Sequence, residues 1–294
     1  MEINNNTLYD KQICVIGMGY VGLTLALTFS DLGFKVIGVE KREKVINSLT
    51  QGRAHFFEAG LNQILKRELG KSFKFLTNLE ESLSDIYIVA VGTPADFGRK
   101  PDFSGLKEVS QQIGKVLKKD DLIILRSTVS PGTTRSFVIP LLEQESGLRA
   151  GTDFYVSFAP ERTIEGDALN ELKTLPQVIG GINSKSALYT ADFFNKITLQ
   201  TILVNSLEAA EMVKLANNLC RDVNFGFANE LALICDKFNL DANEVIEAAN
   251  SGYPRNKIAS PSPGVGGYCL TKDPYILADA VEKKGYSPKL ILSA

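Results

Sequence analysis

The first half of the chain alternates short apolar runs with segments of helical periodicity. The apolar runs have the length of buried parallel strands and lie at residues 13–16, 35–39, 73–77, 86–91, 122–125 and 155–158. Helical segments separate several of them, at residues 23–32, 104–117 and 133–145. Strands that alternate with helices in this way predict an α/β fold of the Rossmann type, with one open, doubly wound parallel sheet.

The second half is dominated by one long helix. Residues 205–239 contain no proline and a single glycine, Gly226, which predicts a helix of roughly 30 residues. Asn205 and Glu208 form a start of the capping-box type. Further helices at residues 241–249 and from about residue 272 complete an all-α central domain. We expect a Rossmann domain over residues 1–203 and this helical domain over residues 204–294, with the long helix as a spine and a dimer contact.

Composition and charge narrow the class of protein. The chain has 294 residues and a net charge of −2, with no long block of Lys or Arg, so nucleic acid is not an expected partner. No apolar run approaches the ~18 residues of a membrane span. The N-terminus is polar and lacks the pattern of a signal peptide, so we expect a cytoplasmic protein.

The cysteines and the histidine limit the possible chemistry. The four cysteines, at positions 14, 220, 235 and 269, are scattered, and a cytoplasmic location argues against disulfides. His55 is the only histidine, so a metal site or a catalytic triad would have to be built on it alone. We therefore expect no metal, and chemistry that uses Cys, Lys, carboxylates, amides and hydroxyls.

A G-x-G-x-x-G motif follows the first predicted strand. Gly17 permits a sharp turn, Gly19 lets a pyrophosphate approach a helix N-terminus, and Gly22 lets the helix lie close to the strand. Glu40 ends the second strand, where its carboxylate can accept hydrogen bonds from a ribose 2′-hydroxyl. The strand, helix and acidic residue together predict dinucleotide binding, and the charge of Glu40 favours NAD over NADP.

Polar residues follow three later strands. They are Thr93 in "VGTP", Ser127 and Thr128 in "RSTVSPGT", and Glu161 and Glu165 in "APERTIEG". Each could be a helix cap or a turn residue. Three polar strand ends at one edge of a sheet favour a shared site instead.

Two features of the second half could carry chemistry. Lys214 and Asn218 are four residues apart and share a face of the long helix, where they are either functional or simply solvated. The segment "PGVGGYCLTKDP", residues 263–274, places three glycines before Cys269. Either it is a tight turn with a small buried cysteine, or the glycines let a substrate approach a nucleophilic sulfur. The residues alone leave both readings open.

The chain resembles the UDP-sugar 6-dehydrogenases, the family of UDP-glucose and UDP-N-acetylhexosamine dehydrogenases. The resemblance covers the whole chain. Its motifs are "GMGYVGL", "VGTP", "STVSPGT", "APERTIEG", "EMVKLANN", "RDVNFGFANEL" and "PGVGGYCLTKD". It implies an NAD enzyme of nucleotide-sugar metabolism and polysaccharide biosynthesis. Family members usually continue with a third domain that holds the UDP, and we expect a chain without it to bind NAD but to turn over UDP-sugar poorly.

The resemblance also implies a mechanism. Carbon C6 of the sugar is oxidised twice, with two NAD, through a thiohemiacetal and then a thioester on Cys269. Lys214 and Asn218 would stabilise the developing oxygen charge. Asp273 and Thr128 would hold a water that takes the hydroxyl proton. Glu161 would activate the water that hydrolyses the thioester.

The ligand contacts follow from the same motifs. The residues expected to bind NAD are Gly17, Gly19, Tyr20, Val21, Gly22, Glu40, Thr93, Thr128 and Glu165. Those expected to bind the sugar nucleotide are Glu161, Arg162, Lys214, Asn218, Gly266 and, from the partner subunit of a homodimer, Arg255.

The substrate and the class of protein have alternatives. Within the family the motifs favour a UDP-N-acetylhexosamine (UDP-N-acetylmannosamine or UDP-N-acetylglucosamine) over UDP-glucose. A hydroxyacid dehydrogenase of the Rossmann type and a non-catalytic NAD-binding module are the other two possibilities.

Overall fold

The computed structural model describes residues 8–95, 100–255, 257–267 and 269–294. The chain divides into two compact units. The first unit comprises Met1–Thr93 and Phe103–Val213, and the second comprises Pro94–Asp102 and Lys214–Ala294. The expected domain boundary between residues 203 and 204 stays a prediction, and each unit is described by itself.

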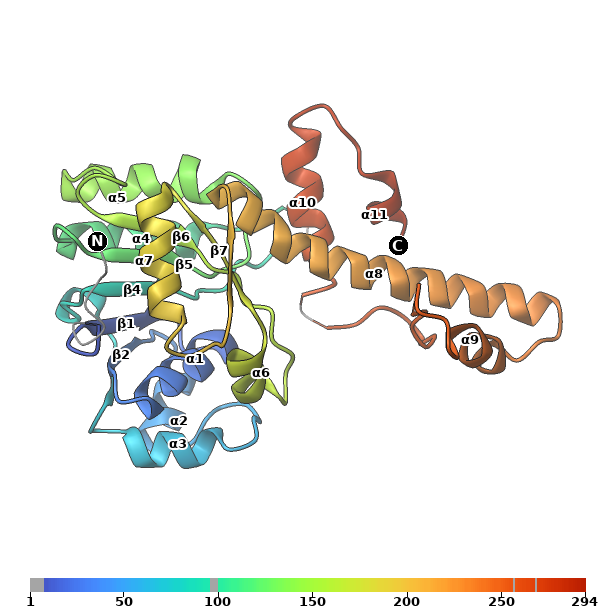
Figure 1. Cartoon of the computed structure of the whole chain (residues 1–294), viewed down its shortest axis with the longest axis horizontal. Coiled ribbons are helices and arrows are strands. Elements are labelled where there is room, and N and C mark those ends of the chain that lie inside the picture. Colours follow the sequence, from blue (N-terminus) through green and yellow to red (C-terminus); the bar gives the residue numbers. More distant parts are fainter. Residues whose placement is uncertain (1–7, 96–99, 256, 268) are drawn as a thin grey trace. The chain divides into compact units, whose positions relative to one another are not determined.

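In the first unit the described residues form one eight-stranded sheet with the order β3-β2-β1-β4-β5-β6-β7-β8 (Figure 1). The strands are β1 (Gln12–Ile16), β2 (Lys35–Val39), β3 (Phe73–Leu76), β4 (Ile86–Val89), β5 (Leu122–Leu125), β6 (Tyr155–Phe158), β7 (Gln177–Gly181) and β8 (Thr201–Val204). All neighbouring pairs are parallel except β6 and β7, which are antiparallel. The strand order reverses direction between β1 and β4, which is where such sheets bind ligands, beyond the carboxyl ends of the strands.

Alternate residues of the strands face two separate cores. Ile13, Ile86 and Ile124 point to one side, where they pack against α1 (Tyr20–Asp31), α3 (Leu61–Glu68) and α7 (Ser184–Phe194). The neighbouring residues of these strands point to the other side, toward α4 (Ser104–Val116) and α5 (Ile139–Ser146). Because both faces are covered, the strands are nearly continuous apolar runs, as the sequence predicts.

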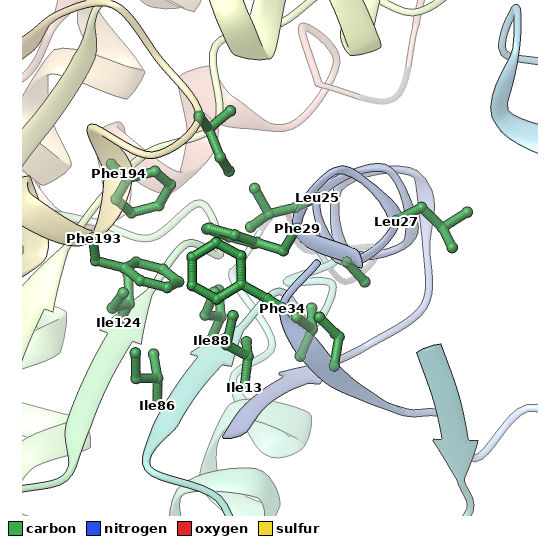
Figure 2. Close-up of a cluster of buried hydrophobic side chains, with 14 of the residues drawn as sticks. Ile13, Leu25, Leu27, Phe29, Phe34, Ile86, Ile88, Ile124, Phe193 and Phe194 are labelled. Atoms are coloured by element: carbon green, nitrogen blue, oxygen red, sulfur yellow. The ribbon is translucent and has the colours of Figure 1, made fainter. Parts of the chain in front are cut away.

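An aromatic cluster fills the first core (Figure 2). The ring of Phe29 on α1 stacks on that of Phe193 on α7 with 4.4 Å between the centroids, and it meets Phe34 edge to face at 5.4 Å. The cluster joins α1 to α7 across the strands that carry Ile13, Ile86 and Ile88. It therefore fixes the helix that starts at the glycine motif.

Several elements of the first unit escape sequence analysis. They are α2 (Glu43–Thr50), α3, α6 (Ala168–Thr174), α7, β7 and β8. The helix predicted at residues 133–145 is present, but it begins with a π-helical turn, η2 (Thr134–Val138), before α5. The doubly wound α/β fold is nevertheless the predicted one.

The second unit is helical, also as predicted. Helix α8 (Leu207–Lys237) begins in the first unit, and its residues from Lys214 onward form the longest helix of the second (Figure 1). Ser206, rather than Asn205, caps it, because the helix begins at Leu207 and the Oγ of Ser206 accepts a hydrogen bond from the amide of Ala209 (3.1 Å). The remaining helices are α9 (Ala242–Asn250), α10 (Asp273–Glu282) and α11 (Lys289–Ser293).

A small core holds the second unit together. Leu215 and Leu219 on α8 pack against Ile276 and Leu277 on α10. Large apolar side chains remain exposed near the end of α8, including Leu233 on the helix and Phe238 directly after it, each 70% exposed. Among the described residues, no helix combines the length and apolar character needed to cross a membrane.

Candidate active site

The glycine motif has the geometry that each of its residues predicts. Gly17 has a φ of +93°, and a Cβ there would lie 2.8 Å from the carbonyl oxygen of Ala90. A Cβ on Gly22 would lie only 1.8 Å from the carbonyl oxygen of Gly17. At Gly19, by contrast, the nearest atom to a Cβ is a guanidinium nitrogen of Arg42 at 3.8 Å. The motif thus leaves open space beside Gly19, at the N-terminus of α1, which fits a pyrophosphate.

Glu40 lies at the end of β2, as expected, but its carboxylate is already well supplied with donors. Arg42 donates from Nε (3.0 Å) and Nη2 (2.7 Å), and the amides of Met18, Lys41 and Arg42 donate as well. Burial acts to raise the pKa of Glu40, but these hydrogen bonds outweigh it and hold the pKa below its usual value. Glu40 is therefore an anion, and Arg42, which sequence analysis left without a role, neutralises it beside the glycine motif.

Tyr20 meets a second residue that sequence analysis missed. Its hydroxyl donates to Glu58 Oε2 (2.6 Å), and the same carboxylate oxygen accepts from the amide of Gly166 (2.9 Å). Burial and the neighbouring Glu58 raise the pKa of Tyr20, so the phenol stays protonated. Glu58 thereby ties the start of α1 to the "APERTIEG" segment. Of the other expected NAD contacts, Val21 is half-buried and Glu165 is exposed.

The polar residues after β4 and β5 are joined by a direct hydrogen bond. The Oγ1 of Thr93, which is buried, donates to the carbonyl oxygen of Thr128 (2.6 Å). The Thr128 side chain is half-buried, whereas Ser127 is buried and its hydroxyl faces the carbonyl oxygen of Val89. The structure therefore brings Thr93 and Thr128 together at one edge of the sheet, as expected, and turns Ser127 inward.

Glu161 belongs to a buried ion pair. Both Nε (3.2 Å) and Nη2 (2.5 Å) of Arg126 donate to Oε2 of Glu161, while the amides of Arg162 and Thr163 donate to Oε1 (2.7 Å each). Arg126 has a side chain only 1% exposed. The Glu161 carboxylate is thus fixed in position, with two protein donors on each oxygen.

The reversal of β7 completes this network. Because β7 runs antiparallel to β6, its first residue, Gln177, lies at the edge where β5 and β6 end. The Oε1 of Gln177 accepts from Arg126 Nη1 (2.9 Å), and its amide nitrogen donates to the carbonyl oxygen of Pro160 (3.0 Å). No local sequence signal identifies Arg126 or Gln177, since their contact depends on the topology of the sheet.

In the second unit, Cys269 lies one helical turn before Asp273. Cys269 is exposed, and its carbonyl oxygen accepts hydrogen bonds from the amides of Lys272 (3.2 Å) and Asp273 (2.9 Å) at the start of α10. Asp273 is fully buried. One of its carboxylate oxygens accepts from Asn218 Nδ2 and the other from Lys272 Nζ, both at 2.6 Å. Lys272 is an addition to the predicted set.

The glycines before Cys269 leave space around the loop. A Cβ on Gly264, Gly266 or Gly267 would have no atom within 4 Å, and Gly267 has a φ of +92°. A cavity of about 500 Å³ in this unit is lined by residues that include Asp222 and Lys272. Tyr268 lies outside the described residues.

The remaining predicted residues of this unit are spread along α8 and the loop after α9. Lys214 is half-buried on α8. Arg255 is exposed and lies over the ring of Tyr253, 4.7 Å from its centroid. Within the described part of the chain, no group of His, Cys, Asp and Glu is arranged to hold a metal ion.

Comparisons with known proteins agree with this geometry. Residues 11–198 match the NAD binding domain of the UDP-glucose/GDP-mannose dehydrogenase family, and residues 208–294 match the central domain of that family. The chain is 39% identical to a UDP-N-acetyl-D-mannosamine dehydrogenase of Pyrococcus horikoshii, over 90% of this chain and 63% of that protein. It is 35% identical to the Campylobacter jejuni UDP-N-acetyl-D-mannosamine dehydrogenase, over 91% of this chain and 67% of that protein.

Solved structures show the same similarity. The UDP-D-ManNAc dehydrogenase of Pyrococcus horikoshii matches with a TM-score of 0.89 and 38% identity, over 95% of this chain and 66% of that one. A UDP-glucose dehydrogenase of Pyrobaculum islandicum also reaches 0.89, at 28% identity, over 96% and 66%. The chain therefore spans about two thirds of the length of the proteins it matches.

Proposed function

Because the chain belongs to the UDP-glucose/GDP-mannose dehydrogenase family, we propose that it serves the NAD-dependent oxidation of C6 of a UDP-sugar to the carboxylic acid. NAD, when bound, accepts one hydride in each of two successive oxidations. The open space at Gly19 and the N-terminus of α1 support pyrophosphate binding by this chain's own residues.

The observation that carries this proposal is the environment of Cys269. Its thiol is exposed, and the three glycines that precede it in the loop leave room for a ligand. The buried Asp273 lies four residues after it and is hydrogen-bonded to Asn218. A structural cysteine is usually buried and inert. An exposed thiol that follows a glycine loop and precedes a buried carboxylate by one helical turn fits a nucleophile.

The chemistry balances with this nucleophile. The first oxidation removes a hydride from C6 and a proton from its hydroxyl, and gives an aldehyde. The Cys269 sulfur then adds to the aldehyde carbon to form a thiohemiacetal, and the second hydride leaves that carbon to give a thioester. Water attacks the thioester, the C–S bond breaks, and the acid and the free thiol are released.

We assign the other side chains to the remaining charges and protons. Lys214 and Asn218 would stabilise the oxygen on C6. Thr128 and Asp273 would hold the water that accepts the hydroxyl proton. Glu161 would take a proton from the hydrolytic water. With two protein donors on each oxygen, its carboxylate must exchange one of these hydrogen bonds for the water.

The proposed substrate is a UDP-N-acetylhexosamine, with UDP-N-acetylmannosamine first. The relatives named as UDP-N-acetyl-D-mannosamine dehydrogenases are 35–39% identical to this chain, whereas the UDP-glucose dehydrogenase structure with the same TM-score is 28% identical. Because both structures match the fold equally well, the preference rests on sequence identity. Arg162 and Gly266 are proposed as further contacts to the sugar nucleotide.

We also propose a homodimer through the second half of α8. Phe227 and Leu233 are 51% and 70% exposed on this half of the helix, and Phe238, directly after it, is 70% exposed. A second copy would remove these side chains from water. Arg255 would reach the substrate of the partner subunit. The four free cysteines suit the reducing cytoplasm that we propose as the location.

The test is an assay of NADH release with UDP-N-acetylmannosamine, UDP-N-acetylglucosamine, UDP-glucose and GDP-mannose. We expect UDP-N-acetylmannosamine to be oxidised fastest, with two NADH formed per acid. Cys269→Ser should stop acid formation, because a hydroxyl is a much poorer nucleophile than a thiolate, whereas Cys220→Ser, at another exposed cysteine, should not.

Two outcomes would favour the alternatives. Normal acid formation by Cys269→Ser would point to a dehydrogenase of the hydroxyacid type, which needs no thiol. NAD binding without oxidation of any sugar in the panel, in a version of the protein extended through a third domain, would favour a non-catalytic NAD-binding module.

A further inference from the structure

Glu211 is a buried carboxylate to which the proposed mechanism gives no role. It lies on the second turn of α8 and is fully buried. Its Oε2 accepts from the amide of Gly132 (2.5 Å), and its Oε1 accepts from the amide (2.8 Å) and the hydroxyl (2.5 Å) of Thr134. All three donors belong to one short segment of the first unit, the loop between β5 and η2.

That loop, residues 127–134, is fixed at both ends. At its start, Thr93 holds the carbonyl oxygen of Thr128 (2.6 Å). In its middle, the amide of Thr133 donates to the carbonyl oxygen of Ser130 (3.1 Å), and Gly132 has a φ of +96°. At its end, the carboxylate of Glu211 accepts hydrogen bonds from Gly132 and Thr134. The path of the loop between Thr128 and Thr134 therefore depends on two side chains that come from outside it.

The loop lies where the sheet binds its cofactor. The strand order reverses between β1 and β4, and β5 is the next strand outward from β4. In such sheets a dinucleotide lies across the carboxyl ends of these strands. We propose that Glu211 is a positioning residue for NAD, which holds the loop 127–134 in the conformation that the cofactor contacts. The inference rests on the proposed contact between Thr128 and NAD.

The convergence of donors indicates an ionised carboxylate in the NAD-competent state. Two amides and a hydroxyl point at its oxygens, and charged acceptors make the stronger hydrogen bonds. Burial, with a smaller contribution from Glu208 on the same helix, raises the pKa of Glu211 to about 7 despite these bonds. From the loop side, the charged side chain of Arg135 interacts with Glu211 electrostatically and pairs with Glu208 (2.6 Å). Protonation of Glu211 near neutral pH would replace an acceptor by a donor and loosen the loop.

The test measures NAD affinity by calorimetry, with no need for turnover. Glu211→Gln has the same shape, keeps one acceptor oxygen and places an amide group against the remaining donor. We expect it to raise the Kd for NAD about fivefold at pH 8. Thr134→Val, which removes only the hydroxyl donor, should raise it about twofold. Glu208→Gln is the matched control, since it breaks an exposed contact to the neighbouring Arg135 and should leave the Kd unchanged.

A pH profile separates positioning from a merely structural role. In the wild type the Kd should rise about fivefold from pH 8 to pH 6, as Glu211 becomes protonated. In Glu211→Gln this rise should be absent. His55 and Asp121 are present in both proteins, so the difference between the two profiles isolates Glu211.

The Kd for NAD at pH 8 decides whether Glu211 positions the loop. A Kd of Glu211→Gln equal to that of the wild type, or a parallel pH profile, would overturn the inference. Should Glu211→Gln fail to fold, Thr134→Val decides by the same comparison with Glu208→Gln. If no UDP-sugar is oxidised even by a version extended through a third domain, but the Kd values shift as expected, the proposed function fails and the inference stands. Oxidation of a UDP-sugar with unshifted Kd values gives the reverse result.

Discussion

The two units can be compared by the side chains that are energetically costly to accommodate, which are buried carboxylates in the first unit and exposed apolar side chains in the second. In the first unit, the buried carboxylates Glu40, Glu161 and Glu211 each accept at least three hydrogen bonds. In the second unit, the costly groups are large apolar side chains that stay in water, such as Leu233 and Phe238. Protein donors therefore hold these three carboxylates of the first unit in place. The exposed apolar side chains of the second unit would be removed from water by a second molecule.

The largest expected difference between the two units is in the reactivity of their cysteines toward a thiol reagent. Cys14 is fully buried in β1, and burial raises its pKa to about 12 from 9.0. Since the thiolate is the reactive form, this shift alone slows alkylation by roughly a thousandfold. Cys269 in the second unit is exposed. We expect a thiol reagent at pH 8 to label Cys269 and Cys220 within minutes and to leave Cys14 unmodified.

Peptide mass mapping after timed alkylation measures this difference. Labelling in urea is the control, because Cys14 should become reactive once the chain unfolds. Equal labelling of Cys14 and Cys269 in the native protein would mean that the first unit opens readily, contrary to the comparison.

The ion pair of Arg126 should contribute the largest stability difference. Arg126→Met leaves Glu161 as a buried charge without its partner, which costs about 3–5 kcal/mol of unfolding free energy. Arg135→Met breaks an ion pair whose side chains are 47% and 33% exposed, and this should cost at most about 1 kcal/mol. Urea denaturation measures both.

The double variant Arg126→Met with Glu161→Gln sharpens this test. Because it removes both charges, it should recover part of the lost stability. Similar losses for Arg126→Met and Arg135→Met would show that the buried network does not stabilise the first unit.

This network also shows where sequence reasoning stops. The predictions for Gly17, Gly19 and Gly22 agree with the structure because each depends on local backbone geometry. Local spacing is thus enough to predict the glycine turn, the strands β1 to β6 and the long helix.

The partners of the predicted residues could not be found in this way. Arg126 meets Glu161 and Gln177 only because β7 runs in reverse beside β6, and Glu211 meets Thr134 across 77 positions. Arg42 is only two residues from Glu40 in sequence, yet the motif gives it no role, and its ion pair with Glu40 is seen only in the structure. Contacts between distant segments need the tertiary fold, which no single motif encodes.

Two glycines allow a direct comparison of the units. Gly22→Ala would place a Cβ 1.8 Å from the carbonyl oxygen of Gly17, so the backbone of the cofactor loop has to move. We expect a loss of about 3 kcal/mol of unfolding free energy, at the upper end for overpacking, together with loss of NAD binding. Gly264→Ala, with no atom within 4 Å of the new Cβ, should change stability by less than about 0.5 kcal/mol. Urea denaturation and calorimetry with NAD measure both effects, and NAD binding by Gly22→Ala at wild-type affinity would contradict the close packing.

The smallest expected effect concerns Asp121, a buried carboxylate of the first unit with a single backbone donor, the amide of Lys118 (2.7 Å). Burial raises its pKa to about 6 from 3.8, and that hydrogen bond only partly offsets the rise. A raised pKa means that the folded state binds the proton more tightly than the unfolded chain, so stability falls as the pH rises from about 4 to about 6. Asp121→Asn cannot ionise, and it should be about 1–2 kcal/mol more stable than the wild type at pH 8 and equally stable at pH 4. Urea denaturation at the two pH values measures the difference, and Asp120→Asn, at the exposed neighbour, should show none.

In the second unit, burial also raises the pKa of Asp222, so Asp222→Asn should shift stability in the same direction. If Asp222→Asn is stabilising at pH 8 and Asp121→Asn is not, unfavourable buried charge is confined to the second unit, and the contrast between the units is sharper than the hydrogen bonds indicate.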